Sequence, residues 1–359
     1  ALDFRNNEYK DNRLVGNVYA ELSPLSSLRI RSQFGFDLRN GNTYAFTPSY
    51  DISPSYRNES PSATQYTDLQ SSLVWDNTVT YDDTFGRHDV EVLGGTTIET
   101  NDYRFIDATT QGQPGNTESL RYLGAGPEVV NIGGSLNESN LLSFFGRANY
   151  NFSDRYLITA VARYDGSSRF GANNRFAFFP SFSAAWRITE EPFFPETDLI
   201  NNLKLRAGWG QNGNQAIGDY AFAATISGNQ DYIANGQLAP GSAPLQSPNP
   251  NVKWEETTQT DVGLDATLFR DHLDLTVGFF NKVTSDLLVY LPPIPTSGLV
   301  NASPENAGEI RNRGWEFSAN YSASPTDDLT LRVGGNLTTI ENEVVSLARS
   351  TDFVINSGF

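Results

Sequence analysis

The residues that could do chemistry in this sequence are mostly charged side chains inside stretches that otherwise favour β-strands. Arg147 and Arg163 are clear cases, because each lies in a run where apolar and polar residues alternate. From Leu142 to Phe152 the even positions are mainly apolar, and the odd positions are mainly Ser, Asn and Arg. A period of two residues indicates a strand with one apolar and one polar face. These charges therefore need a sheet whose polar face meets water or other charges.

No combination of residue types indicates an active site. The two histidines, His88 and His272, fall in expected short turns, and we interpret them as solvated residues rather than as ligands or bases. The acidic residues of 190–198 lack the interleaved spacing of a calcium loop and are interpreted as a wet turn. Hydrolase, zinc-protease and P-loop motifs do not occur in the sequence. We therefore predict that the protein is not an enzyme, with no catalytic residue, no metal site and no cofactor.

Two kinds of surroundings produce strands with one apolar face. A soluble sandwich turns that face inward to a core, whereas a transmembrane barrel turns it outward to lipid and lines its lumen with polar groups. The sequence has no run of about 18 apolar residues, so a membrane protein of this sequence would span by strands. The absence of cysteine suits an envelope protein that is exported unfolded. A net charge of -17 makes nucleic acid an unsuitable partner.

The lengths of the connections separate these two possibilities. About twelve segments alternate, and they centre on residues 14–22, 28–38, 69–81, 89–99, 142–152, 156–165, 176–188, 203–210, 261–269, 273–282, 314–321 and 329–337. Connections after odd-numbered segments are mostly short, with 189–201 a longer member. Most of those after even-numbered segments are long, and these are about 39–66, 100–140, 211–256 and 291–312. Outer-membrane barrels alternate short periplasmic turns with long extracellular loops, so the sequence predicts an all-β, transmembrane antiparallel β-barrel.

Aromatic residues lie at both ends of the alternating segments. Those beside short turns are Phe152, Tyr156, Phe269 and Tyr321, and those beside long loops are Tyr164, Trp209 and Trp315. Two such groups are expected of the aromatic girdles at the two surfaces of a membrane. Aromatic residues that cover the ends of a soluble core are the alternative interpretation.

Function is expected on the lumen face and in the long loops. The alternation places on the lumen face Arg147, Arg163, Arg187, Lys204, Arg206, Asp261, Asp265 and Glu316. Charges of both signs in a wet lumen can pair with one another, hold a plug or line a solute path. The loop aromatic residues that could stack on sugar rings or peptides are Tyr44, Tyr50, Tyr122, Tyr232 and Trp254. Folding of the loops themselves is the alternative role for these rings.

Four motifs, in order along the chain, resemble the SusC/RagA family of TonB-dependent outer-membrane transporters. They are LKLRAGWGQNGNQAIGDY (203–220), NPNVKWEETTQTDVGLDATLF (249–269), NKVTSDLLVYLPPIP (281–295) and NAGEIRNRGWEFSANY (306–321). The likeness covers roughly residues 140–340, and residues 1–140 match only in pattern. It implies a 22-stranded barrel with an N-terminal plug in the bacterial outer membrane, energised by the TonB complex and commonly lidded by a SusD-like lipoprotein.

On this resemblance, residues 1–359 are a later part of the outer-membrane β-barrel domain, without the plug or the segment that contacts TonB. The implied function is active import of large nutrients, glycans or peptides, across the outer membrane. A passive porin or structural barrel is one alternative, and a soluble glycan-binding protein or glycosidase is the other. We expect a native polypeptide more than twice as heavy as 39.6 kDa, because the matched motifs belong to the later strands.

Overall fold

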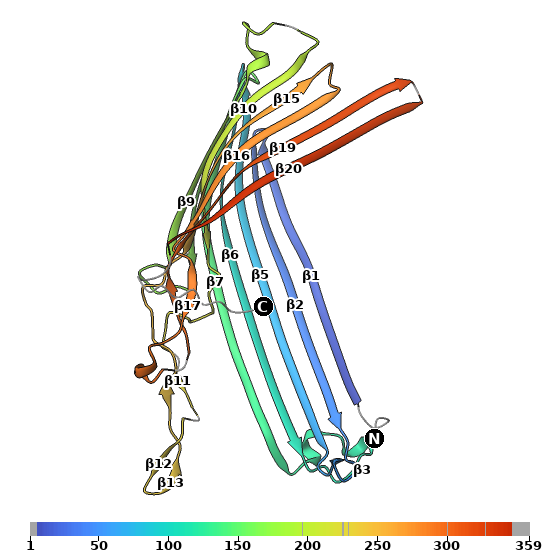
Figure 1. Ribbon diagram of the computed structural model, residues 1–359, viewed down its shortest axis with the longest axis vertical. Helices are drawn as coiled ribbons and strands as arrows, with labels where there is room; N and C mark the ends of the chain where they lie inside the picture. The colour runs from blue at the N-terminus through green and yellow to red at the C-terminus, as the bar shows by residue number, and fades with distance from the viewer. Residues whose placement is uncertain are drawn as a thin grey trace. The chain divides into compact units, whose positions relative to one another are not determined.

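The computed structural model describes residues 6–195, 197–224, 226–228, 230–299, 301–326 and 328–346. In these residues twelve strands form one sheet, in which each long strand pairs with the next long strand along the chain (Figure 1). The strands are β1 (Asn6–Leu25), β2 (Leu28–Thr47), β5 (Ser62–Phe85), β6 (His88–Gln111), β7 (Glu128–Phe152), β8 (Tyr156–Ser167), β9 (Phe176–Arg187), β10 (Ile200–Asn214), β15 (Glu255–Leu268), β16 (Leu273–Ser285), β19 (Glu309–Thr326) and β20 (Leu329–Ser346). The topology is therefore a succession of hairpins.

The connections contain short elements of their own. The strands among them are β3 (Tyr50–Ser53), β4 (Tyr56–Asn58), β11 (Ile226–Ser227), β12 (Tyr232–Ala234), β13 (Gln237–Ala239), β14 (Ala243–Pro244), β17 (Leu288–Leu291) and β18 (Ser303–Asn306). The 3-10 turns are η2 (Glu118–Leu120), η3 (Leu123–Ala125), η4 (Ile188–Glu190) and η5 (Pro295–Ser297). No helix in the described part of the chain is long and apolar enough to cross a membrane.

The chain divides into two compact units, and each is described by itself. Unit 1 comprises residues 1–21, 31–77 and 97–141, and unit 2 comprises residues 22–30, 78–96 and 142–359. Unit 2 contains the whole of β8, β9, β10, β15, β16, β19 and β20, whose successive pairs are antiparallel. Its strand register therefore fixes which side chains share a face.

Each alternating segment found in the sequence overlaps one of the twelve long strands, and the predicted all-β architecture is confirmed. The predicted loops 39–66 and 100–140 are too wide, because β2 continues to Thr47 and β7 already begins at Glu128. In these extensions the apolar face keeps Tyr44 and Phe46 in β2 and Val130, Ile132 and Leu136 in β7, but polar residues interrupt it, so the alternation is weaker there. Backbone hydrogen bonds between strands continue there although the apolar pattern is interrupted.

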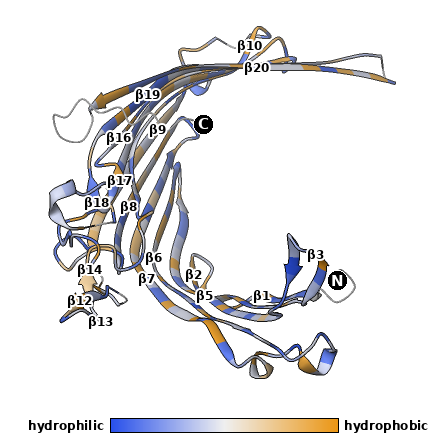
Figure 2. Ribbon diagram, turned by 60° about the horizontal axis from the view of Figure 1, so that its bottom comes forward, coloured by the Kyte–Doolittle hydropathy of each residue, from blue (hydrophilic) through white to orange (hydrophobic). Residues whose placement is uncertain are grey.

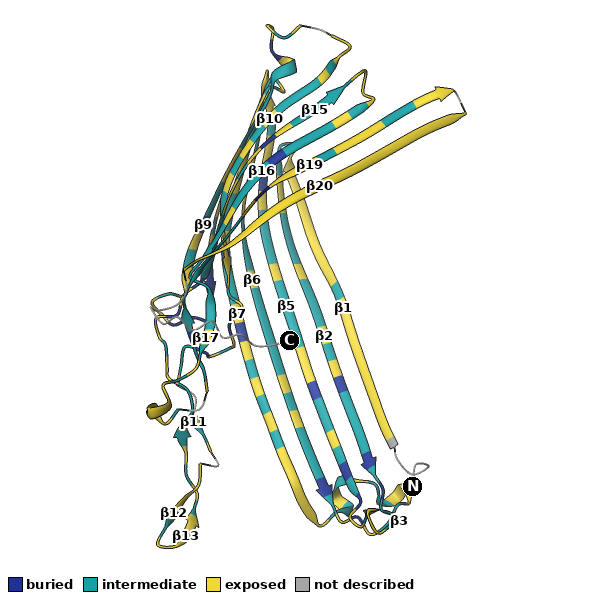
Figure 3. Cartoon of the chain, in the orientation of Figure 1, coloured by how far each residue is buried: buried dark blue, intermediate teal, exposed yellow. Residues whose placement is uncertain are grey.

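One face of the unit 2 sheet is apolar and is left partly exposed. Leu205 lies opposite Leu264, Leu264 opposite Val277, and Val277 opposite Phe317, which makes an apolar row across four strands. Leu264 is 39% exposed and Phe317 is 40% exposed. Figure 2 shows apolar and polar positions alternating along the strands, and Figure 3 shows how many of them are exposed or only half-buried. A soluble sandwich would cover this face with a second layer, whereas lipid covers it in a membrane barrel.

We predict that an arginine is costly only on the apolar face. Leu264→Arg should destabilise the full-length protein by about 2–4 kcal/mol, because the new charge enters hydrocarbon. Thr276→Arg, on the opposite face between Asp265 and Ser318, should cost less than about 1 kcal/mol. Reversible folding into lipid bilayers measures both changes. Equal costs for the two variants would contradict the assignment of the faces.

Candidate functional site: the polar face of unit 2

The strand register gathers the predicted lumen residues of unit 2 on one face. Arg187 lies opposite Lys204, and Lys204 lies opposite Asp265. Directly opposed residues of an antiparallel pair point to the same side of the sheet, and so do residues two apart on one strand. By the same rule Arg163, Arg206, Asp261 and Glu316 belong to this face, which we call the polar face.

Arg147 joins the polar face through side-chain contacts. Asn149, two residues along β7, accepts a hydrogen bond from Thr159 of β8 at 2.9 Å. Ser143, on the same side of β7, accepts one from Arg163 at 2.9 Å. All eight predicted residues therefore share one face. That this face lines a lumen is an inference taken up below.

Two cations share one carboxylate at the centre of the polar face. Lys204 Nζ lies 3.0 Å from Asp265 Oδ2, and Arg206 Nε lies 3.4 Å from Asp265 Oδ1. Asp261 on the same strand accepts a hydrogen bond from Gln259 at 2.8 Å. The side chains of Lys204 and Arg206 are over a third exposed, and ion pairs of that kind contribute little to stability. The cluster therefore determines where charged groups lie on the polar face.

Arg206 lies flat across two neighbouring strands because they carry glycine beneath it. A Cβ atom at Gly263 would lie 2.6 Å from Cζ of Arg206. The position of a Cβ atom at Gly278 is 3.6 Å from Nη2 of Arg206 and 3.9 Å from Oε2 of Glu316. The four residues form one row across β10, β15, β16 and β19. Arg206 pairs with Gly263, Gly263 pairs with Gly278, and Gly278 pairs with Glu316. The glycines let a guanidinium from one strand reach toward a carboxylate three strands away.

A hollow of about 340 Å³ adjoins this row. Its lining includes the small residues Thr159, Ser183, Ala185 and Gly208. Lys204, Arg206 and Asp261 also line it. The hollow can therefore accept a polar group and offer it both a cation and a carboxylate.

The other predicted charges are paired locally, with one exception. Arg147 contacts Glu91 at 2.7 Å and Arg163 contacts Asp165 at 2.7 Å. Arg187 contacts Glu190 at 2.9 Å. Glu316 forms no ion pair with any residue that the structure describes. Mutual pairing is thus the main state of these side chains, and Glu316 remains open to another group.

Three of the predicted loop aromatic residues pack against other parts of unit 1. Tyr44 lies in β2, and its hydroxyl donates to the carbonyl oxygen of Arg121. The rings of Tyr44 and Tyr122 are 6.4 Å apart, and those of Tyr50 and Tyr56 are 5.4 Å apart. Tyr122 keeps most of its surface exposed, so it can still present a ring face to a solute.

Trp254 is buried and organises the base of the connection before β15. It is 4% exposed, and its indole N–H donates to the carbonyl oxygen of Arg175 at 3.1 Å. Its ring lies 5.1 Å from that of Phe170 and 5.5 Å from that of Phe179. A ring enclosed in this way has no free face for a sugar or peptide, which favours the folding role for Trp254. Tyr232, by contrast, is exposed on β12.

The sequence interpretation of 190–198 as a wet turn does not hold at Glu191, which is buried. Its carboxylate accepts hydrogen bonds from the indole of Trp186 at 3.0 Å and from the hydroxyl of Tyr156. Nη1 of Arg155 lies 3.7 Å from Oε2 of Glu191. The Tyr156 and Trp186 hydrogen bonds, with the charge of Arg155, lower the pKa of Glu191 below its usual range. Alternation could not reveal this contact, because Glu191 lies outside the strands.

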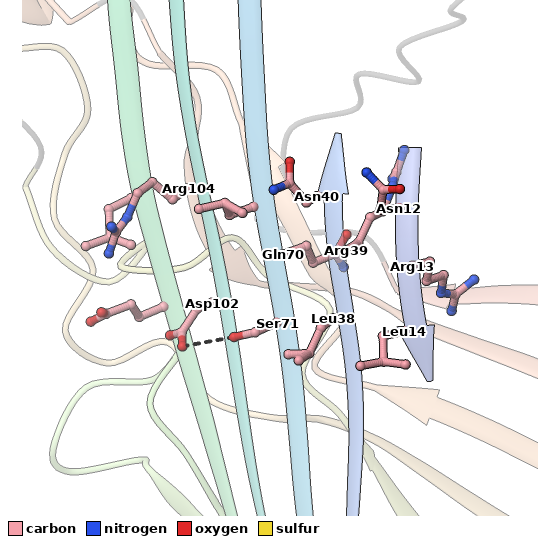
Figure 4. A pocket seen from close by; sticks show the side chains of 13 residues that line it. Asn12, Arg13, Leu14, Leu38, Arg39, Asn40, Gln70, Ser71, Asp102 and Arg104 are labelled. Carbon is pink, nitrogen blue, oxygen red and sulfur yellow. Dashed lines mark hydrogen bonds between the residues drawn. The ribbon is translucent and has the colours of Figure 1, made fainter. Parts of the chain in front are cut away.

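Unit 1 carries a hollow of about 570 Å³ on the apolar side of its strands, which sequence reasoning missed (Figure 4). Leucines line one part of it and polar residues the other, and its lining includes Leu14, Leu38, Leu69, Leu136, Asn12, Asn40, Ser71, Asp102, Arg104 and Glu138. Ser71 donates to Asp102 at 3.3 Å within it.

Comparison with known proteins identifies the fold. The family model described as "TonB dependent receptor-like, beta-barrel" matches residues 2–357. The chain belongs to the TonB-dependent receptor β-barrel family. The fold class, the SusC/RagA resemblance and the outer-membrane location predicted from the sequence are thereby confirmed. Proteins of this family transport rather than catalyse, so the prediction that the chain is not an enzyme is confirmed as well.

Two curated TonB-dependent receptors illustrate the similarity. The chain is 32% identical over 351 residues to TonB-dependent receptor P3 of Formosa agariphila, which covers 98% of this chain and 35% of that protein. It is 30% identical over 367 residues to the TonB-dependent receptor SusC of Bacteroides thetaiotaomicron, covering 100% of this chain and 36% of that protein. The chain therefore spans about a third of the length of these relatives.

Solved TonB-dependent transporters show the same fold. The RagAB peptide importer in its "closed-closed" state superposes with a TM-score of 0.88 at 26% identity, covering 99% of this chain and 39% of that chain. The ferric citrate transporter FecA superposes with a TM-score of 0.52 at 11% identity, covering 94% of this chain and 44% of that chain. The second likeness concerns the fold alone.

Adding a methyl group beneath Arg206 should disturb the charge cluster. We predict that Gly263→Ala displaces the guanidinium and lowers nutrient uptake by the full-length receptor by as much as Arg206→Ala does. The double variant should be no worse than either single variant, because the two residues act together. Gly94→Ala is the matched control, since a Cβ atom there would have no described atom within 4 Å. Wild-type uptake in Gly263→Ala beside impaired uptake in Arg206→Ala would contradict this account.

Glu191 should make folding sensitive to acid. A carboxyl whose pKa is lowered in the folded state stabilises the protein above its unfolded pKa, and this contribution is lost as the pH falls through the folded pKa. The unfolding temperature should therefore drop below about pH 4.3, and Glu191→Gln should show a smaller drop. Thermal unfolding of the full-length protein in detergent, from about pH 7 to about pH 3, measures this. Glu190→Gln is the control, and an identical response of the two variants would refute the role of Glu191.

Proposed function

We propose that this chain forms part of the wall of a TonB-dependent importer that carries large nutrients, peptides or glycans, across the outer membrane. The observation that supports it best is the polar face of unit 2. Its charges of both signs lie opposite an apolar face that suits lipid, so the polar face suits a wet lumen. Membership of the TonB-dependent receptor β-barrel family supports the proposal that this face lines the lumen of an outer-membrane barrel.

The polar face suits two tasks in such an importer. The hollow beside Lys204 can hold a polar side chain of a plug while the lumen is closed. When the plug is displaced by energy from the TonB complex, the same half-exposed charges can line the path of a solute. The plug and the TonB-contacting segment are proposed to belong to the remainder of the full-length polypeptide.

The partners follow from the relatives. SusC is a similar protein, and the RagAB structures are described as a peptide transporter. We propose that the chain's long connections after β2, β6, β10 and β16 lie outside the cell, where a SusD-like lipoprotein covers the opening. Tyr50, Tyr122 and Tyr232 remain the proposed contacts for a captured nutrient.

Energy dependence separates this proposal from a passive porin. In cells that carry the full-length gene, uptake of a labelled oligopeptide or oligosaccharide that supports growth should stop when the TonB protein is deleted. A porin would pass the same solute in both strains, because diffusion through an open channel needs no coupling. Equal uptake with and without TonB would therefore refute the import mechanism.

A further inference from the structure

Asp68 of β5 is a buried carboxylate without a partner. It is only 7% exposed, and it forms no ion pair or hydrogen bond with any residue that the structure describes. A buried charge is costly unless an opposite charge or several hydrogen bonds satisfy it. In the described part of the chain, fully enclosed side-chain atoms that lack a partner occur at Gln113, Asn151, Ser153 and Asn202, but not at Asp68. The Asp68 carboxylate therefore keeps an opening through which another group can reach it.

Glycine on the neighbouring strand makes room for this carboxylate. A Cβ atom at Gly41 of β2 would collide with Oδ1 of Asp68. The same arrangement recurs in β6, where Oδ1 of Asp107 would collide with a Cβ atom at Gly133 of β7. Asp107 accepts a hydrogen bond from the side chain of Asn131, but it has no ion pair with a described residue. Two carboxylates thus lie over backbone that carries no side chain, and neither is neutralised.

Three aromatic side chains share a face with these carboxylates. The hydroxyl groups of Tyr66 and Tyr103 are 2.6 Å apart. The ring of Phe105 lies 5.7 Å from that of Tyr66 and 6.1 Å from that of Tyr103, and all three residues are half-buried. Residues two apart on a strand point to the same face, which joins Tyr66 to Asp68 and Phe105 to Asp107. We call these five residues the acidic aromatic cluster.

The acidic aromatic cluster lies on the face of unit 1 opposite its hollow. Leu69, which follows Asp68 in β5, lines that hollow on the apolar side. Successive side chains of a strand point to opposite faces, so the cluster lies on the side that the proposed function assigns to the lumen. Because β5 begins at Ser62 and β6 ends at Gln111, the cluster is near the strand ends that carry long connections. A solute that enters from that end would meet the cluster early.

A basic group satisfies the acidic aromatic cluster better than other ligands do. A sugar hydroxyl can donate a hydrogen bond to Asp68, but it leaves the buried charge in place. A metal ion would find few ligands, because no three His, Cys, Asp or Glu side chains gather among the described residues. A planar guanidinium supplies the missing positive charge, donates to a carboxylate through two N–H groups and can lie against an aromatic ring.

We propose that the acidic aromatic cluster binds a basic side chain, above all arginine, of a peptide that enters the lumen. This inference rests on the proposed function and narrows its substrate class, because it favours positively charged peptides over neutral or acidic glycans. Asp68 pairs with the guanidinium, and the ring of Phe105 lies against it. Asp107 adds a second negative charge from the neighbouring strand.

The test measures the binding of two short fluorescent peptides to the purified full-length transporter. The peptides share one sequence, except that one carries arginine where the other carries citrulline, its neutral isostere. The wild-type protein should bind the arginine peptide about tenfold or more tightly. Asp68→Asn should remove this preference by weakening the arginine peptide alone. Asp102→Asn should keep the preference and is the matched control, since Asp102 points to the opposite face of β6, where Ser71 donates to it.

The ring contributes less than the buried charge. Phe105→Leu should weaken the arginine peptide by about two- to fivefold, with a smaller change for the citrulline peptide. Failure of the wild-type protein to bind either peptide, equal affinities for both, or a preference that survives Asp68→Asn would overturn the proposal. Asp68-dependent binding of a neutral oligosaccharide would overturn it as well.

Thermal unfolding of the ligand-free transporter distinguishes a binding role of Asp68 from a structural one. Asp68→Asn should leave the unfolding temperature unchanged or raise it, because it removes a buried charge that has no partner. A lower unfolding temperature would mean that a basic residue elsewhere in the polypeptide already pairs with Asp68, and the proposal would fall. Neither readout involves energy coupling, so a failure here is distinct from uptake that persists without TonB.

Discussion

Every part of this structure depends on the need to pair backbone amide and carbonyl groups from one strand to the next. Hydrocarbon offers these groups no hydrogen-bond partner, so a strand in lipid must be satisfied by its two neighbours. In a paired strand successive side chains point to opposite faces. One face of the sheet can then contact lipid while the other contacts water. The apolar row from Leu205 to Phe317 and the charged cluster around Asp265 lie on opposite faces of the same hydrogen-bonded strands.

Small residues determine what the polar face can do. Gly263 and Gly278 remove the side chains that would otherwise lift Arg206 off the wall. Ser183, Ala185 and Gly208 open the hollow beside it. The charged residues supply the chemistry, but their reach is set by neighbours that carry almost no side chain. With larger residues in place of these glycines and small residues, the same charged groups would lie farther from the backbone of the sheet.

Much of this arrangement could be predicted from the sequence, and the reasons for the remainder are physical. Arg163, Lys204 and Asp265 could be assigned to one face from the alternation alone, because successive side chains of a strand point to one face or the other. Trp254 could not be assigned, because its partners Phe170 and Phe179 are far away in sequence and only the fold brings them together. The ends of β2 and β7 were missed because polar residues such as Asn40 and Glu138 interrupt the apolar face there. Side chains in connections, such as Glu191, obey no period at all.

The length of the strands has a consequence for where a nutrient first meets the protein. β5 and β6 each contain 24 residues, which at about 3.3 Å per residue is a strand of roughly 80 Å. Even with the usual tilt of about 40°, such a strand is about twice as tall as a hydrocarbon layer of about 30 Å. On the proposed orientation, in which the long connections lie outside the cell, the surplus would form a collar of hydrogen-bonded sheet above the membrane surface. A large solute would therefore be confined by this collar well before it reaches the depth of the lipid.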